Sequence, residues 1–164
     1  MKTIKLSCAH ALFKFLIAQK TIIDGKKVPL FPGAFAIYGH GNVACLGQAM
    51  EEFQSDLPGY RGHHEQSMAL SCIGYARAMR RKQIFIATSS SGPGAMNMVT
   101  AAGVALSNRL PLLLLPGDVF ASRFPDPVLQ QVENFNSPVE NQNDAFKSVS
   151  RFFDRITRPE RILN

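Results

Sequence analysis

The sequence of 164 residues has few cysteines and no long apolar run, and both absences limit the classes of protein that it can encode. Its cysteines, Cys8, Cys45 and Cys72, are widely spaced without a C-x-x-C pair, so neither a zinc cluster nor a disulfide framework is expected. No stretch approaches the roughly 20 apolar residues that a membrane-spanning helix requires. The N-terminal apolar segment lacks the small-residue cleavage site of a signal peptide. We therefore expect a soluble, cytoplasmic protein with reduced thiols and no membrane partner.

Charge is also scarce and only slightly unbalanced. Charged residues make up 18% of the chain, and 18 Lys and Arg against 12 Asp and Glu give a formal net charge of +6. The densest basic run, Arg77 to Lys82, falls where a helix is expected to end, and cations there favour the negative end of the helix dipole. This distribution indicates a solvated helix terminus and no nucleic-acid partner.

Apolar periodicity predicts alternating strands and helices. The predicted strands are 34–38, 83–88 and 112–115, and the predicted helices are a first one capped by Ser7, then 43–53, 65–79 and 95–108. Residues 24–27 read as a turn, residues 134–144 as a loop, and 146–156 as either a strand or a helix. Strand, loop, helix and strand recur at the interval of βαβ units, so we expect an α/β fold with a mainly parallel sheet. A last helix that only begins at Thr157 suggests a fragment of a longer chain.

Three familiar motifs fail on inspection. Residues 39–44 have the G-x-G-x-x-A form of a dinucleotide fingerprint, but residues 53–59 do not form the second strand that should hold the ribose. His64-Glu65 begins a zincin pattern, yet Met68 stands where the second histidine should be, so no metal site is predicted. Ser89 to Ser91 lack the G-x-S-x-G elbow of serine hydrolases.

A carboxylate and a glycine-rich loop about 25 residues later form a stronger pair. Glu65 opens an otherwise apolar helix, which alone is common because acidic residues favour the first turn. Residues 88–97 read T-S-S-S-G-P-G-A-M-N, and Gly92 and Gly94 allow the backbone to come close to a flat ligand. This loop follows a strand, where α/β sheets bind their ligands.

The combination of H-E-Q at 64–66, G-Y-A-R at 74–77 and S-G-P-G-A-x-N at 91–97 resembles the pyrimidine-binding domain of thiamine-diphosphate enzymes, such as acetolactate synthase and its relatives. The resemblance runs from about residue 5 to residue 164. It implies one pyrimidine-binding domain over 1–164, with three α/β/α layers around a doubly wound, mainly parallel sheet. Residues 35–43, 108–111 and 115–133 are similar, within this family, to inositol-catabolism hydrolases that open a cyclic diketone by carbon–carbon cleavage.

The resemblance also implies roles for individual residues. Glu65 matches the family's cofactor-activating glutamate, which would hydrogen-bond the pyrimidine ring nitrogen and is expected to be largely buried. His40 lies in the loop that faces the reacting end of the cofactor, and we expect it to contact substrate or relay protons. Asp118 is a further substrate candidate. The remaining cofactor-binding residues that the motif implies are Gly92, Pro93, Gly94 and Asn97.

The G-D-G motif and the asparagine pair that hold Mg²⁺ and the diphosphate in this family are missing, since residues 117–119 read G-D-V. In the family they lie in a separate C-terminal domain, and the site forms between that domain of one subunit and the pyrimidine domain of another. The resemblance thus implies thiamine diphosphate, Mg²⁺ bound by the absent domain, a homodimer or higher homo-oligomer, and a polyhydroxy cyclic diketone as substrate. The fragment alone would be inactive.

Two other interpretations stay open at this point. The chain could be the pyrimidine domain of an acetolactate synthase-like or decarboxylase enzyme, which an assay on pyruvate would separate from ring opening. It could also be a non-catalytic split subunit that requires a separate diphosphate-binding chain, which a G-D-G protein encoded beside it would favour.

Overall fold

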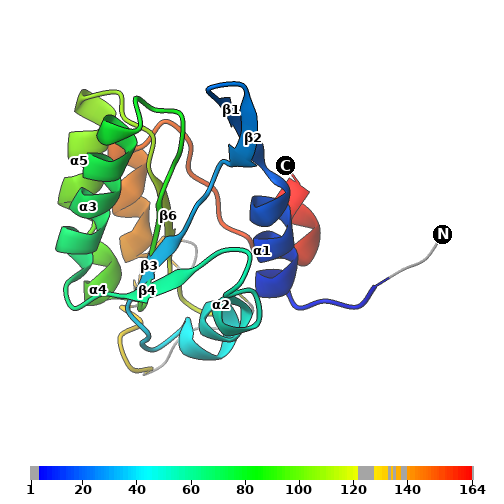
Figure 1. Ribbon diagram of the computed structural model, residues 1–164. Coiled ribbons are helices and arrows are strands. Elements are labelled where there is room, and N and C mark those ends of the chain that lie inside the picture. Colours follow the sequence, from blue (N-terminus) through cyan, green and yellow to red (C-terminus); the bar gives the residue numbers. More distant parts are fainter. Residues whose placement is uncertain (1–3, 122–127, 133, 135, 138–139, 164) are drawn as a thin grey trace.

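A four-stranded parallel sheet forms the centre of the computed structural model, which describes residues 4–121, 128–132, 134, 136–137 and 140–163 (Figure 1). The strand order is β4-β3-β5-β6, and all three pairings are parallel. The strands are β3 (Ala34–Ala36), β4 (Gly59–Arg61), β5 (Ile86–Ser89) and β6 (Leu113–Pro116). The predicted α/β class with a mainly parallel sheet is confirmed. Residues 122–127 and 133 belong to the segment 115–133 that is similar to inositol-catabolism hydrolases, and they lie outside the described residues.

Helices cover both faces of this sheet, as the doubly wound architecture requires (Figure 1). On one face, Phe13, Leu16 and Met50 pack against strand residues such as Ile86. On the other, Cys72, Met98 and Phe146 form a second apolar core. The first face carries α1 (Cys8–Ala18), the π-helix η1 (Val43–Gly47) and α2 (Gln48–Glu52), and the second carries α3 (Glu65–Ala78), α4 (Pro93–Met96), α5 (Val99–Ser107) and the 3₁₀ helix η2 (Gln142–Val149).

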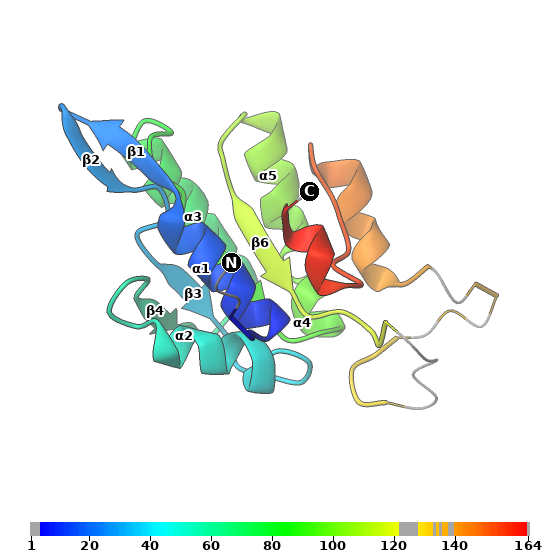
Figure 2. The ribbon, with the colours of Figure 1, turned by 90° about the vertical axis from the view of Figure 1, so that its right-hand side faces the viewer.

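Two peripheral elements complete the described chain. Strands β1 (Lys20–Ile23) and β2 (Lys26–Pro29) form an antiparallel hairpin that projects beyond α1 (Figure 2). Asp24 and Gly25 turn it with φ of 50° and 77°, the positive values that a tight hairpin turn requires. The 3₁₀ helix η3 (Pro159–Leu163) packs near α1. No helix among the described residues is long and apolar enough to cross a bilayer.

The sheet has a topological switch between β3 and β5. The chain leaves β3 through η1 and α2 on one face, whereas it leaves β5 through α4 and α5 on the opposite face. The two strands are neighbours, and the carboxyl edge of the sheet at such a switch is where open α/β sheets bind their ligands. Residues 37–42 and 90–92 line this edge, so the fold brings together the two glycine-rich loops of the sequence.

Several predicted boundaries were wrong. The strand expected at 83–88 lies at Ile86–Ser89, and β4 was not predicted at all. The helix expected over 95–108 is divided between α4 and α5. The segment 146–156 is neither a strand nor an α-helix, because η2 ends at Val149 and an extended chain follows.

Candidate functional site

The first turn of α3 fixes Glu65 at the carboxyl edge of the sheet. The preceding loop is anchored to β3, since Gly62 N donates to Ala36 O at 2.9 Å. His64 caps the helix, and its Nδ1 accepts from Ser67 N at 3.3 Å, so Glu65 is the first helical residue. Glu65 is half-buried among the described residues, and the largely buried glutamate that the resemblance implies stays a prediction.

The two sequence motifs meet at this carboxylate. Asn97 Nδ2 donates to Glu65 Oε2 at 3.0 Å, across 32 residues of sequence. Among the described residues, Glu65 Oε1 has no hydrogen-bond partner. Gly94 lies against the same oxygen, because a Cβ on Gly94 would stand 3.0 Å from Oε1 and would overlap Ser90 Oγ. One carboxylate oxygen is therefore held, and the other faces a space that only a glycine leaves open.

Gly92 and Pro93 shape the turn and have no contact with the carboxylate. Gly92 has φ of 77°, and a Cβ there would overlap the main-chain carbonyl of Gln130. Pro93 is the first residue of α4, where a proline costs no helical hydrogen bond, and it is exposed. These two residues direct the chain from β5 into α4, which brings Gly94 and Asn97 to Glu65.

His40 lies in the neighbouring loop at the same edge of the sheet. Its carbonyl accepts from Ser91 N at 3.0 Å, and its ring Nδ1 is 3.5 Å from Ser91 Oγ. A Cβ on Gly39 would stand 2.6 Å from Ser90 Cβ, so this loop packs directly on the loop that follows β5. The half-buried His40 and Glu65 are thus separated by the short segment around Ser90.

Asn42 anchors the His40 loop, although no sequence motif singled it out as a site residue. Its side chain is buried and donates to Thr88 Oγ1 at 3.0 Å and to Ser89 O at 2.5 Å. Thr88 Oγ1 in turn donates to Leu115 O at 2.7 Å. Its place directly after the G-H-G turn is the one sequence feature that marks it. These bonds connect the ends of three neighbouring strands and hold this edge of the sheet in shape.

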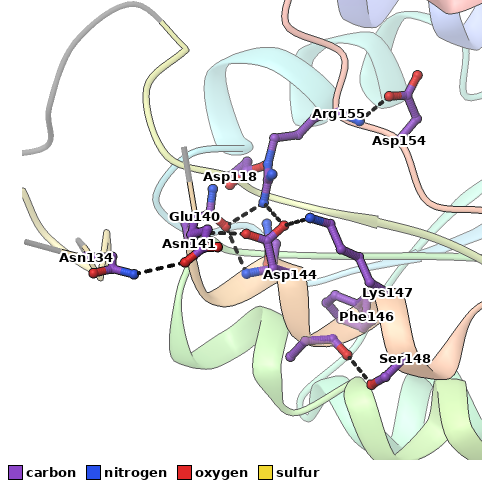
Figure 3. A network of polar contacts seen from close by, with 12 residues as sticks. Asp118, Asn134, Glu140, Asn141, Asp144, Phe146, Lys147, Ser148, Asp154 and Arg155 are labelled. Carbon is purple, nitrogen blue, oxygen red and sulfur yellow. Dashed lines mark hydrogen bonds and ion pairs between the residues drawn. The ribbon is translucent and has the colours of Figure 1, made fainter. Parts of the chain in front are cut away.

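Asp118 belongs to a different polar cluster (Figure 3). Arg155 bridges two carboxylates, with Nε 2.7 Å from Asp118 Oδ2 and a terminal nitrogen 2.9 Å from Asp144 Oδ1. Burial alone would raise the pKa of Asp144, but hydrogen bonds from the Asn141 backbone, Lys147 and Arg155 hold that pKa below its ordinary value. The cluster connects the loop after β6 to the C-terminal segment. The Asp118 carboxylate is therefore paired with Arg155 in this cluster and is not paired with a residue beside Glu65.

Two other features do not coincide with the site. A mainly apolar groove of about 980 Å³ lies between α1, β6 and the C-terminal segment, and none of the predicted site residues lines it. Within the part of the chain that the structure describes, no group of three or more His, Cys, Asp or Glu side chains could hold a metal ion.

Comparison with known proteins agrees with the motifs. Residues 33–137 match the family described as thiamine pyrophosphate enzyme, N-terminal TPP binding domain. Curated relatives named 3D-(3,5/4)-trihydroxycyclohexane-1,2-dione hydrolase occur in Clostridium tetani (53% identical over 99% of this chain and 25% of the relative) and Geobacillus thermodenitrificans (52% identical, 100% and 26%). A third, from Listeria monocytogenes, is 49% identical over 99% of this chain and 26% of the relative. The chain thus spans about a quarter of the length of these relatives.

Proposed function

The chain belongs to the thiamine pyrophosphate enzymes, whose N-terminal TPP-binding domain it contains, and from this premise we propose that it forms the pyrimidine half of the active site of a hydrolase that opens a trihydroxycyclohexane-dione ring by carbon–carbon cleavage. The observation that carries the cofactor assignment is the Glu65 carboxylate, with Oε2 held by Asn97 and Oε1 facing the space beside Gly94. The substrate assignment is supported by the names of relatives at about 50% identity.

The residues around Glu65 fit an aminopyrimidine ring. Such a ring is flat, and Gly94 leaves a space beside Glu65 that any side chain would occupy. Glu65 Oε1 has its lone pairs available to a ring nitrogen or its attached proton. When bound, thiamine diphosphate supplies an electron sink for the carbanion that carbon–carbon cleavage produces.

In this proposal Glu65 is the catalytic residue that holds a proton at Oε1 and exchanges it with the pyrimidine ring nitrogen. Asn97 donates to Oε2 and so fixes the plane of the carboxylate toward the ring. A positioned group of this kind contributes roughly 10²–10⁴ in rate. Gly92 and Pro93 support cofactor binding without contacting the carboxylate, because they form the turn that places Gly94 and Asn97 beside Glu65.

We assign His40 to the substrate side of the site. Its ring is half-buried in the loop next to Ser90, and its Nδ1 lies near the Ser91 hydroxyl. An imidazole in this place can donate to a substrate oxygen or relay a proton near neutral pH. Asp118 has the weaker claim as a substrate contact, because its carboxylate is already paired with Arg155.

The rest of the site would come from outside these residues. We propose that residues 1–164 form one pyrimidine-binding domain. A C-terminal diphosphate domain of a partner subunit would hold Mg²⁺ and the diphosphate. The enzyme would be a cytoplasmic homodimer or higher homo-oligomer. The absence of a G-D-G motif from the sequence supports this division. The isolated chain should then have no ring-opening activity.

The test compares the complete enzyme with its Glu65→Ala and Glu65→Gln variants, using ring opening of the cyclic diketone and calorimetric titration of thiamine diphosphate with Mg²⁺. We expect activity to fall by roughly 10²-fold or more in both variants, because each loses the ionisable group. Full activity in Glu65→Gln would refute the role of Glu65. Turnover of pyruvate in place of the diketone would retain the cofactor assignment and replace the substrate.

A further inference from the structure

Ser90 has a hydroxyl that the contacts described so far leave unused. The residue is only 4% exposed, and within the described part of the chain no hydrogen bond of its Oγ is found. This oxygen is not one of the fully buried side-chain oxygens that lack a partner, so water can still reach it. Ser90 lies between the Gly39 loop and Gly94, and its hydroxyl is next to Gly94.

The two neighbouring serines show that this is specific to Ser90. Ser89 Oγ donates to Ser90 O at 3.0 Å, and Ser91 Oγ donates to His40 O at 3.3 Å. Both hydroxyls are therefore satisfied by the main chain of the loops. Only the middle serine of the three directs its hydroxyl to the space beside Gly94.

Glu65 Oε1 borders the same space. A Cβ on Gly94 would contact both oxygens, Oε1 at 3.0 Å and Ser90 Oγ more closely still. Because residue 94 is glycine, this space is left free. Two oxygens without a hydrogen-bond partner among the described residues, one a donor and the other an acceptor, thus border the same space.

We propose that Ser90 is a positioning residue for Glu65, whose hydroxyl donates to Oε1 when thiamine diphosphate is bound. This inference rests on the proposed cofactor function. A carboxylate oxygen has two lone pairs, so Oε1 can accept from Ser90 and still face the ring nitrogen. Asn97 on Oε2 and Ser90 on Oε1 would then hold the carboxylate at both ends. A hydroxyl also accepts from a protonated carboxyl, so Ser90 can partner Glu65 in either state.

The experiment is a double-mutant cycle on the complete enzyme, with thiamine diphosphate and Mg²⁺ as the probe. Ser90→Ala, Glu65→Ala and the double variant are titrated by calorimetry, and the cofactor-induced rise in melting temperature measures binding that is too weak to titrate. Ser89→Ala is the matched control, since it removes a hydroxyl one residue away that contacts only main chain. Ser90→Cys keeps the size of the side chain with a weaker donor.

We expect Ser90→Ala to weaken cofactor binding about 3- to 10-fold, the effect of one hydrogen bond. In the Glu65→Ala background the same change should cost less than about 2-fold, because its acceptor is gone. Ser90→Cys should fall between serine and alanine, and Ser89→Ala should bind like the parent enzyme.

Two results would overturn the inference alone: parental affinity in Ser90→Ala, or an equal loss with and without Glu65. If the parent enzyme does not bind thiamine diphosphate at all, the proposed function fails together with this inference.

Discussion

Alanine at Gly94 should weaken cofactor binding and alanine at Gly92 should lower stability, although only Pro93 separates the two residues. Gly94 lies in α4 with helical backbone, where alanine is favoured over glycine by up to about 1 kcal/mol. The atoms that a new Cβ would meet, Ser90 Oγ and Glu65 Oε1, are side-chain ends that can rotate away. The free energy of unfolding should therefore change by less than about 1 kcal/mol.

Cofactor binding should respond to Gly94→Ala much more strongly than stability does. The new methyl group fills the space beside Oε1 and displaces both oxygens that border it. Losing two hydrogen bonds of about 1 kcal/mol each predicts a roughly 10- to 30-fold weaker Kd for thiamine diphosphate. Calorimetric titration of the complete enzyme measures this loss, and urea unfolding of the same sample measures stability.

Gly92→Ala is the comparison that makes this result interpretable. Its φ of 77° costs a non-glycine residue about 1–3 kcal/mol, and its Cβ would overlap the main-chain carbonyl of Gln130, which cannot rotate away. This variant should lose stability by at least that amount. If Gly94→Ala binds cofactor like the parent, or if Gly92→Ala is as stable as the parent, the assignment of these two glycines is wrong.

Two further predictions concern titratable groups. Burial raises the pKa of Cys72 to about 12, so a thiol reagent at pH 8 should label the exposed Cys45 in the native protein and reach Cys72 only after unfolding. Peptide mass spectrometry identifies the labelled cysteines, and rapid labelling of Cys72 in the native protein would contradict its burial. Asp144 has a lowered folded-state pKa, so its stabilising effect is present above its ordinary pKa near 3.8 and is lost as pH falls through the lower folded value. Asp144→Asn should therefore reduce the free energy of unfolding at pH 7 and flatten its dependence on pH below about 4, and an unchanged acid-unfolding curve would refute the role of the Arg155 network.

The parallel sheet could be predicted because its central strands are continuous apolar runs. The apolar runs at 83–88 and 112–115 carry this signal locally. Strand β5 is buried along its whole length, whereas β6 at the edge of the sheet is half-buried. Strand β4 has no such signal, since it has three residues, starts after Pro58 and leaves Tyr60 and Arg61 exposed. Its pairing with β3 defines it, and that contact is non-local. Local patterns therefore predicted three of the four strands and missed the edge strand β4.

The site shows the same division between local and non-local signals. The motif resemblance singled out Glu65, Gly94 and Asn97, and the structure brings them into contact. Nothing in the run Ser89-Ser90-Ser91 distinguishes the middle serine, because the three hydroxyls differ only in what the fold places opposite each. Asn42 was missed for the same reason, since its partners come from the strand ends of β5 and β6.

The half-buried state of Glu65 is best understood through what surrounds its two oxygens. The chain supplies a donor for Oε2 and leaves Oε1 and Ser90 Oγ unpaired beside Gly94. Neither atom is among the fully buried side-chain oxygens that lack a partner, so water can reach both of them in the domain alone. In the proposed complex, a ring nitrogen at Oε1 would replace this water and the Ser90 hydroxyl would donate to the same oxygen. The low exposure that the resemblance implies for this glutamate is therefore expected of the cofactor-bound enzyme, whereas the domain alone has the carboxylate in position and one oxygen open.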